Sequence, residues 1–332
     1  MTNFWKGKRV LVTGADGFIG SHLVEELAKR GAKVKAFVFY NSFDRWGWLD
    51  YTPQGLLKHI DIFPGDIRDN ERTREAVRDQ DIVFHLASLI AIPYSYHAPQ
   101  SYVDTNIKGA LNILRACREF KIEHFIHTST SEVYGTALHI PIDETHPLQP
   151  QSPYSATKIG ADMLAESFFH SFNTPVTIVR PFNTYGPRQS IRAVIPTIIT
   201  QLLSGTKRLK LGALHPTRDF NFVLDTVAGF ISLAETAATV GKTVNIGSGR
   251  EISIGDLVKL LTRLVGTKAE IICEQRRLRP KQSEVNRLLC NAQRARKLAG
   301  WLPKYTLEEG LKITTEGYRD NLKLFRPQTY VL

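Results

Sequence analysis

The chain has 332 residues, 42% of them hydrophobic, which is enough to bury the core of one large domain or of two coupled ones. Its longest apolar runs, such as 194–203, fall short of the roughly 20 residues that a membrane-spanning helix needs. Lysine and arginine exceed aspartate and glutamate by 43 − 32 = 11, but the basic residues are dispersed, which favours a solvated basic surface over a nucleic-acid site.

The first half of the chain alternates short β-branched runs with amphipathic helical patterns. In the first helical pattern Ile19, Leu23 and Leu27 recur every four residues and Gly31 ends the run, so this face should pack on a sheet. Such alternation predicts βαβ units that wind a parallel sheet. The expected strands include 8–14, 33–40, 81–88, 124–130 and 174–182, and a long helix is expected near 98–119.

The second half is less regular and richer in arginine and proline. We expect helices near 193–204, after Asp225 and at 253–265, strands in RLKLG, FNFV and VNIGS, and two helices near the C-terminus. The fold class is therefore α/β, a doubly wound parallel sheet with a smaller C-terminal region that covers a substrate and is interleaved with the sheet.

Three glycines, Gly14, Gly17 and Gly20, lie in VLVTGADGFIG between the first strand and the first helix. Without side chains, this turn lets a pyrophosphate approach the positive N-terminus of the helix. The alternative is a tight turn with no ligand, but the position in the first βα turn favours a dinucleotide site.

The second strand ends in Phe39, Tyr40, Asn41 and Ser42, which are neither acidic nor basic. An acid there would favour NAD and an arginine NADP, so these residues leave the choice open. Asp66 and Ile67, after the third strand, are placed to meet an adenine, although Asp66 is equally compatible with capping a helix at 70–78.

Tyr154 and Lys158, in SPYSATK, stand four residues apart and would share one face of a helix. A nearby ammonium should lower the pKa of the tyrosine and make it a usable base for removing a hydroxyl proton. The cysteines, Cys117, Cys273 and Cys290, are widely spaced, and the ten histidines show no HExxH-like grouping, so we expect neither a disulfide framework nor a metal.

Five motifs together resemble the extended short-chain dehydrogenase/reductase family: TGADGFIG, HLAS (85–88), the Ser/Thr cluster at 128–131, YSATK and RPFNTYGPR (180–188). The resemblance covers nearly the whole chain and implies a Rossmann sheet with a nucleotide-sugar-binding region, usually in a dimer. It implies a dinucleotide-binding domain over 1–182 and a mainly sugar-binding region over 183–332. It makes Tyr154 and Lys158 the catalytic pair and puts Thr130 at the family's catalytic Ser/Thr position.

The resemblance also assigns binding residues. Those for the dinucleotide are Gly14, Gly17, Phe18, Ile19, Gly20, Asn41, Ser42, Asp66, Ile67, Leu86, Ala87, Ser88, Asn106, Thr128, Tyr154 and Lys158. Those for the nucleotide sugar are Ile90, Asn183, Arg188, Arg192, Arg218 and Arg279, since guanidinium groups suit a diphosphate.

Thr130-Ser131-Glu132 is similar to the corresponding triplets of GDP-mannose and dTDP-glucose 4,6-dehydratases. Once C4 of the sugar is a ketone, a carboxylate such as Glu132 can remove the acidic C5 proton while hydroxide leaves C6. UDP-glucuronate decarboxylases also carry Thr-Ser-Glu, C4 epimerases usually lack the glutamate, and Glu132 could simply open a surface loop.

Longer segments, 40–50, 87–109 and 180–196, look similar to bacterial dehydratases that act on nucleotide-linked N-acetylglucosamine. Phe39 departs from relatives that often have arginine there, which favours NAD over NADP. The sequence therefore predicts a cytoplasmic, homodimeric 4,6-dehydratase with a tightly bound, recycled dinucleotide, a nucleotide-diphosphate sugar as substrate, and no nucleic-acid or membrane partner.

Overall fold

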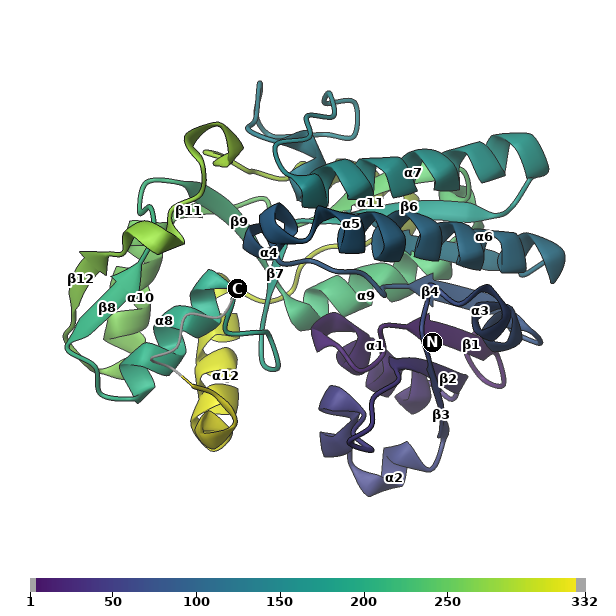
Figure 1. The fold of residues 1–332 in the computed structure, drawn as a ribbon, viewed down its shortest axis with the longest axis horizontal. Coiled ribbons are helices and arrows are strands. Elements are labelled where there is room, and N and C mark those ends of the chain that lie inside the picture. Colours follow the sequence, from purple (N-terminus) through teal and green to yellow (C-terminus); the bar gives the residue numbers. More distant parts are fainter. Residues whose placement is uncertain (1–3, 327–332) are drawn as a thin grey trace.

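A seven-stranded sheet lies at the centre of this computed structural model, which describes residues 4–326 (Figure 1). Its strand order is β3-β2-β1-β4-β5-β6-β10, and every neighbouring pair is parallel. The first six strands follow the order typical of a dinucleotide-binding sheet. The strands are β1 (Arg9–Thr13), β2 (Lys33–Phe39), β3 (Ile60–Gly65), β4 (Ile82–His85), β5 (His124–Thr128), β6 (Val176–Pro181) and β10 (Lys242–Ile246).

Helices cover both faces of this sheet, so the predicted doubly wound arrangement is confirmed. Val10 and Val12 of β1 pack on one face with helices α1, α9 and α11, whereas Leu11 faces α3, α6 and α7 on the other. The alternation follows from the two-residue repeat of a strand that is buried on both sides. These helices are α1 (Phe18–Lys29), α3 (Asn70–Val77), α6 (Gly109–Glu119), α7 (Pro153–Phe172), α9 (Val223–Ala234) and α11 (Gln293–Ala299).

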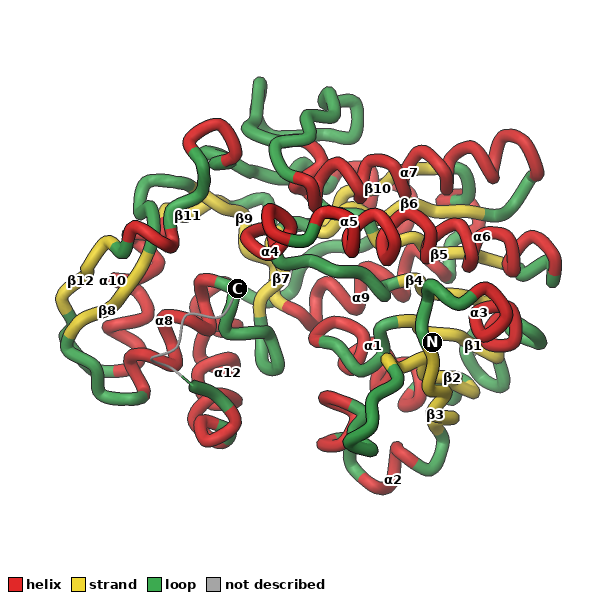
Figure 2. Tube along the Cα trace, in the orientation of Figure 1, coloured by secondary structure: helices red, strands yellow, loops and turns green. Residues whose placement is uncertain are grey.

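The helix expected near 98–119 is present, but not as one regular α-helix. It consists of α5 (Pro99–Tyr102), a π-helical segment (Val103–Lys108) and α6. π-Helical turns are rare and occur frequently at functional sites. Figure 2 shows the loop after β4 running to α4 (Ile92–His97), which precedes this composite helix.

The smaller region has its own apolar core between α8, α10 and α12. Its remaining strands form two small sheets, β11-β9-β7 and β12-β8. The chain returns to the main sheet through β10, so the two regions are interleaved in sequence. The elements are β7 (Asn183–Tyr185), α8 (Val194–Leu203), β8 (Arg208–Leu211), β9 (Thr217–Phe222), β11 (Glu251–Ser253), α10 (Ile254–Val265), β12 (Glu270–Cys273) and α12 (Leu307–Asp320); a short helix, α2 (Gln54–Leu57), precedes β3.

The helix predicted after Asp225 begins earlier, at Val223, and the strand predicted in FNFV begins at Thr217. Asp225 does not cap the helix. Its carboxylate accepts hydrogen bonds from the backbone N–H groups of Lys304 and Tyr305, at 2.9 and 3.1 Å. Local sequence does not reveal a contact made 80 residues away.

Within residues 4–326, no helix is long and apolar enough to cross a membrane. The same residues contain no group of three or more His, Cys, Asp or Glu side chains that could hold a metal ion.

Candidate active site

One cavity of about 1400 Å³ lies where the carboxyl ends of the main-sheet strands meet the smaller region. Ligand sites for one small molecule are typically about 300–1,000 Å³, so this cavity has room for two ligands side by side. We call its two sides the glycine wall (Gly14, Asp16–Gly20, Asp66–Ile67 and Leu86–Ser88) and the arginine wall (Arg188, Arg192, Arg218, Arg277, Arg279 and Glu284).

The glycine wall leaves no room for side chains at its first turn. Gly14 has φ +66°, and a Cβ atom on it would lie 2.9 Å from the backbone of Ala87. A Cβ on Gly20 would lie 2.1 Å from the carbonyl oxygen of Gly14. Gly17 is the N-cap residue of α1. The glycines therefore permit this close packing, and all three line the cavity at the N-terminus of α1, where a pyrophosphate would bind.

Asp66 lines the cavity and does not cap α3. Its carboxylate pairs with the guanidinium group of Arg68, at 2.5 Å between Oδ2 and Nη2, and this hydrogen bond lowers the pKa of Asp66. The cap is Asp69, whose side chain accepts a hydrogen bond from the Arg72 N–H. The capping alternative for Asp66 is therefore wrong, and the carboxylate stays beside the cavity.

Asn41 and Ser42 do not line the cavity. Asn41 instead donates a hydrogen bond from Nδ2 to the carbonyl oxygen of Arg45, at 2.7 Å. This bond closes a loop in which the chain leaves the cavity after β2 and then returns to it. The returning residues Arg45, Trp48 and Tyr51 reach the cavity, and sequence reasoning missed them. The only available signal was the cluster of aromatic residues directly after the predicted strand.

Each residue of Thr128–Thr130, at the end of β5, makes a different contact. The carbonyl oxygen of Thr128 accepts a hydrogen bond from Lys158 Nζ at 2.5 Å. Ser129 Oγ donates to Asp162 at 2.7 Å, and Thr130 Oγ1 accepts from the backbone N–H of Glu132 at 3.2 Å. The hydroxyl-rich stretch therefore fixes the carboxylate-bearing turn to helix α7.

Tyr154 and Lys158 are both buried on one face of α7, whose N-cap residue is Ser152. Burial raises the pKa of Tyr154 above its usual range, and a hydrogen bond with Thr130 opposes that rise. Burial also lowers the pKa of Lys158 to about 8. The lowered tyrosine pKa expected from the sequence is therefore wrong here, because the phenol is withdrawn from water and the ammonium donates to the Thr128 carbonyl oxygen.

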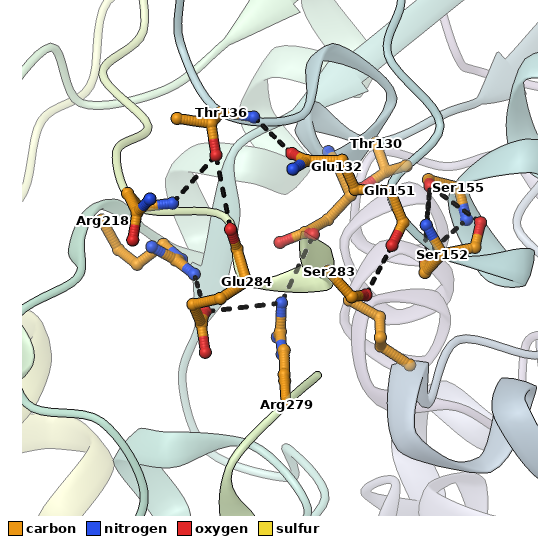
Figure 3. A network of polar contacts seen from close by, with 12 residues as sticks. Thr130, Glu132, Thr136, Gln151, Ser152, Ser155, Arg218, Arg279, Ser283 and Glu284 are labelled. Carbon is orange, nitrogen blue, oxygen red and sulfur yellow. Dashed lines mark hydrogen bonds and ion pairs between the residues drawn. The ribbon is translucent and has the colours of Figure 1, made fainter. Parts of the chain in front are cut away.

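Glu132 belongs to a chain of ion pairs along the arginine wall (Figure 3). Arg218 Nη2 lies 3.3 Å from a carboxylate oxygen of Glu284. Arg279 Nη1 lies 4.0 Å from Glu284 and 3.7 Å from Glu132. Arg279 Nη1 is buried and makes no hydrogen bond to the described residues, so it can still donate one to an anionic ligand oxygen.

Arg188 also lines the cavity, but its guanidinium group is turned toward α1. It donates to Ser21 Oγ at 3.2 Å and pairs with Glu25 at 2.9 Å. Asn106 lies in the π-helical segment. Its Oδ1 accepts a hydrogen bond from the Leu89 N–H, and its Nδ2 donates to the Leu89 carbonyl oxygen and to the Thr157 hydroxyl. Asn106 therefore positions the loop after β4 without reaching the cavity.

The other predicted residues are brought together around the cavity. Those that line it, besides the ones described above, are Phe18, Ile19, Ile67, Leu86, Ala87, Ser88, Ile90, Ser131, Asn183 and Arg192. Glu284 and Arg277 were missed, because their pairing with Arg218 and Glu274 is not evident from the sequence. Gln189 and Ser190 line it as well, directly after the predicted motif RPFNTYGPR.

The chain matches the GDP-mannose 4,6 dehydratase family over residues 11–314. It is 31% identical to the dTDP-D-glucose 4,6-dehydratase of Homo sapiens over 328 residues, covering 95% of this chain and 91% of that protein. The solved dTDP-glucose 4,6-dehydratase of Bacillus anthracis str. Ames, in complex with NAD, superposes with a TM-score of 0.83 at 28% identity, covering 97% of this chain and 99% of that one. The UDP-glucuronic acid 4-epimerase of Bacillus cereus, in complex with UDP-glucuronic acid and NAD, gives 0.84 at 29% identity, covering 94% and 99%.

Proposed function

Because this chain belongs to the GDP-mannose 4,6-dehydratase family of nucleotide-sugar dehydratases and epimerases, we propose that it is a nucleotide-sugar 4,6-dehydratase. Its product would be the 4-keto-6-deoxy sugar. The glycine wall fits a dinucleotide, and the NAD complexes of the two solved relatives support NAD as the cofactor.

The observation that carries the proposal is the position of Glu132. Its carboxylate lines the cavity directly after Thr130 and Ser131, close enough to Tyr154 to raise the pKa of the phenol. Reversing the configuration at C4 needs only a base for the C4 hydroxyl, whereas dehydration also needs a base for the C5 proton.

In the reaction, Tyr154 takes the proton of the C4 hydroxyl, with Thr130 hydrogen-bonded to the phenol. When bound beside the glycine wall, a nicotinamide would supply the oxidation at C4 and the later reduction at C6, so no external oxidant would be consumed. Glu132 removes the C5 proton and passes it to the C6 hydroxyl, which leaves as water, and C5 later takes a proton from solvent. A positive charge on Lys158, one turn further along α7, would favour the tyrosinate that forms when Tyr154 acts as the base, against the rise in the phenol pKa that burial causes.

The substrate we propose is a nucleoside diphosphate linked to N-acetylglucosamine. Segments 40–50, 87–109 and 180–196 support this sugar through the resemblance described above. The diphosphate would lie on the arginine wall, where guanidinium groups can bind phosphate oxygens in pairs. The sugar-binding role of residues 183–332, and a cytoplasmic homodimer as the working form, belong to the same proposal.

The decisive test is a substrate panel analysed by mass spectrometry. Purified protein with NAD is incubated with UDP-N-acetylglucosamine, GDP-N-acetylglucosamine and UDP-glucuronate. Loss of water from an N-acetylglucosamine nucleotide supports the proposal. Loss of carbon dioxide from UDP-glucuronate would make the protein a decarboxylase, and a changed C4 configuration at constant mass would make it an epimerase.

A further inference from the structure

A buried charged cluster lies under the proposed catalytic residues. Asp162, on α7, has no exposed surface, and its Oδ2 accepts hydrogen bonds from Ser129 Oγ at 2.7 Å and from Arg180 Nη2 at 3.0 Å. His127 Nε2 lies 3.3 Å from the other carboxylate oxygen. Burial alone would raise the pKa of Asp162, but contacts with His127, Arg180 and Ser129 hold it below its usual range. The carboxylate is therefore charged.

The position of Asp162 is tied to that of the catalytic pair. Tyr154, Lys158 and Asp162 are spaced by four residues along α7 and so lie on one face of the helix. Ser129, which Asp162 holds, immediately precedes Thr130. One carboxylate thus joins the two segments that carry all the proposed catalytic side chains.

The charged groups around Lys158 come from several elements. Asp162 faces it from α7 and raises its pKa, against the effect of burial. His127 of β5 and His85 of β4 are fully buried, and burial lowers the pKa of both, so they stay neutral near pH 7. Arg180 of β6 carries a positive charge, but it is paired with Asp162 at 3.0 Å, and Glu132 adds a negative charge beside Tyr154.

We propose that Asp162 is a positioning residue that keeps the Lys158 ammonium charged and holds the Ser129–Glu132 segment against Tyr154. The alternative is an ion pair with Arg180 that only stabilises the fold. Its importance for turnover rests on the proposed function, but its effect on Lys158 does not, because the charge on Lys158 can be measured without a substrate.

The first measurement is the pH titration of Lys158 by NMR in protein carrying isotope-labelled lysine, with Lys158→Arg used to assign the signal. In Asp162→Asn the titration should shift down by about one pH unit, because an opposite charge is lost. Asp162→Glu, which retains the charge, should restore the midpoint. An unchanged midpoint in Asp162→Asn would overturn the proposal.

Because Asp162→Asn leaves Arg180 unpaired in the core, it can fail to fold. The double variant Asp162→Asn/Arg180→Gln removes both charges and should show a smaller downward shift, because loss of the Arg180 charge offsets part of the loss of the carboxylate. An unshifted midpoint in that variant would also overturn the proposal.

The second measurement uses the reaction itself. The pH above which kcat falls should move down with the Lys158 midpoint in Asp162→Asn, or in the double variant. Ser129→Ala should lower kcat several-fold with KM nearly unchanged and the Lys158 midpoint unmoved, since it cuts only the link to the Thr130 segment. If these variants lower only the melting temperature, Asp162 is a structural residue. If wild-type protein dehydrates no sugar but the Lys158 midpoint shifts, the proposed function fails and this inference stands.

Discussion

The two walls of the cavity are built in different ways. The glycine wall is backbone, presented by the ends of parallel strands and closed to side chains at Gly14 and Gly20. The arginine wall consists of charged side chains from loops and small sheets, which pair with one another across the sequence, as Arg218 does with Glu284. A rigid backbone surface suits a cofactor that stays bound, whereas a set of paired charges can exchange partners when an anionic substrate arrives.

The largest expected effect lies where the two walls meet. Tyr154→Phe should lower the rate of 4-keto sugar formation by about 10²–10⁴-fold, the usual contribution of a general base or acid. Only a hydroxyl is lost, so thermal melting should stay close to that of wild type. Near-normal turnover would show that another group takes the C4 proton.

Next comes a test that separates the walls. Arg218→Gln should weaken binding of the nucleotide sugar by about 10- to 100-fold, because a hydrogen bond to a charged group contributes roughly 1.5–3 kcal/mol. Binding of NAD should not change. The control is Arg287→Gln, which breaks an ion pair with Glu251 outside the cavity. Calorimetry that shows equal losses for both ligands would contradict the division into two walls.

On the glycine wall, Gly20→Ala should destabilise the fold by about 1–3 kcal/mol, as overpacking usually does. The added Cβ would lie 2.1 Å from the Gly14 carbonyl oxygen, so the turn must shift and NAD retention should fall. Gly55→Ala is the matched control, since a Cβ there meets nothing within 4 Å. Equal NAD content in the two purified variants would mean that the turn does not hold the cofactor.

The smallest expected effect concerns His22, whose contact with Pro187 joins α1 to the segment that carries Arg188. His22 on α1 contacts the carbonyl oxygen of Pro187 at 3.2 Å, and burial lowers its pKa to about 4. An unfolded histidine titrates near 6.5, so between that pH and about 4 the unfolded state binds more protons and stability falls as the pH falls. From pH 6.5 to 5.5 the loss should be about 1 kcal/mol. Denaturant unfolding of His22→Gln should show a shallower acid slope, whereas His59→Gln, at an exposed position, should not.

The glycine wall could be predicted from sequence because each of its segments follows a strand of the βα repeat. Gly14, Asp66 and Leu86 all stand directly after such strands. The arginine wall could be predicted only in part. Glu284 pairs with Arg218, which is distant in sequence, and Arg277 pairs with Glu274 in an irregular segment that no periodic pattern identifies. The position of Asn41 outside the cavity could not be predicted for a related reason, because its side chain binds the Arg45 carbonyl oxygen in the loop after β2.

Charge states were harder to predict than positions. The spacing of Tyr154 and Lys158 correctly placed both residues on one face of α7. It did not reveal that burial would raise the pKa of the phenol, or that Asp162 would lie one turn further along the helix to support the ammonium. Burial of an ionisable group depends on the packing of the whole cavity, which no local pattern contains.

The most direct test of the central claim is exchange at C5 of the sugar in deuterated solvent. Wild-type product should carry deuterium at C5, because the proton that Glu132 removes is replaced from solvent. Glu132→Gln keeps the shape but not the basicity, so it should form product about 10²–10⁴-fold more slowly and leave C5 of the remaining substrate protonated. Glu284→Gln, which removes the neighbouring carboxylate of the same ion-pair chain, should weaken binding yet still exchange C5. If Glu132→Gln turned over at the wild-type rate with deuterium at C5, Glu132 would not be the base and the account would be contradicted.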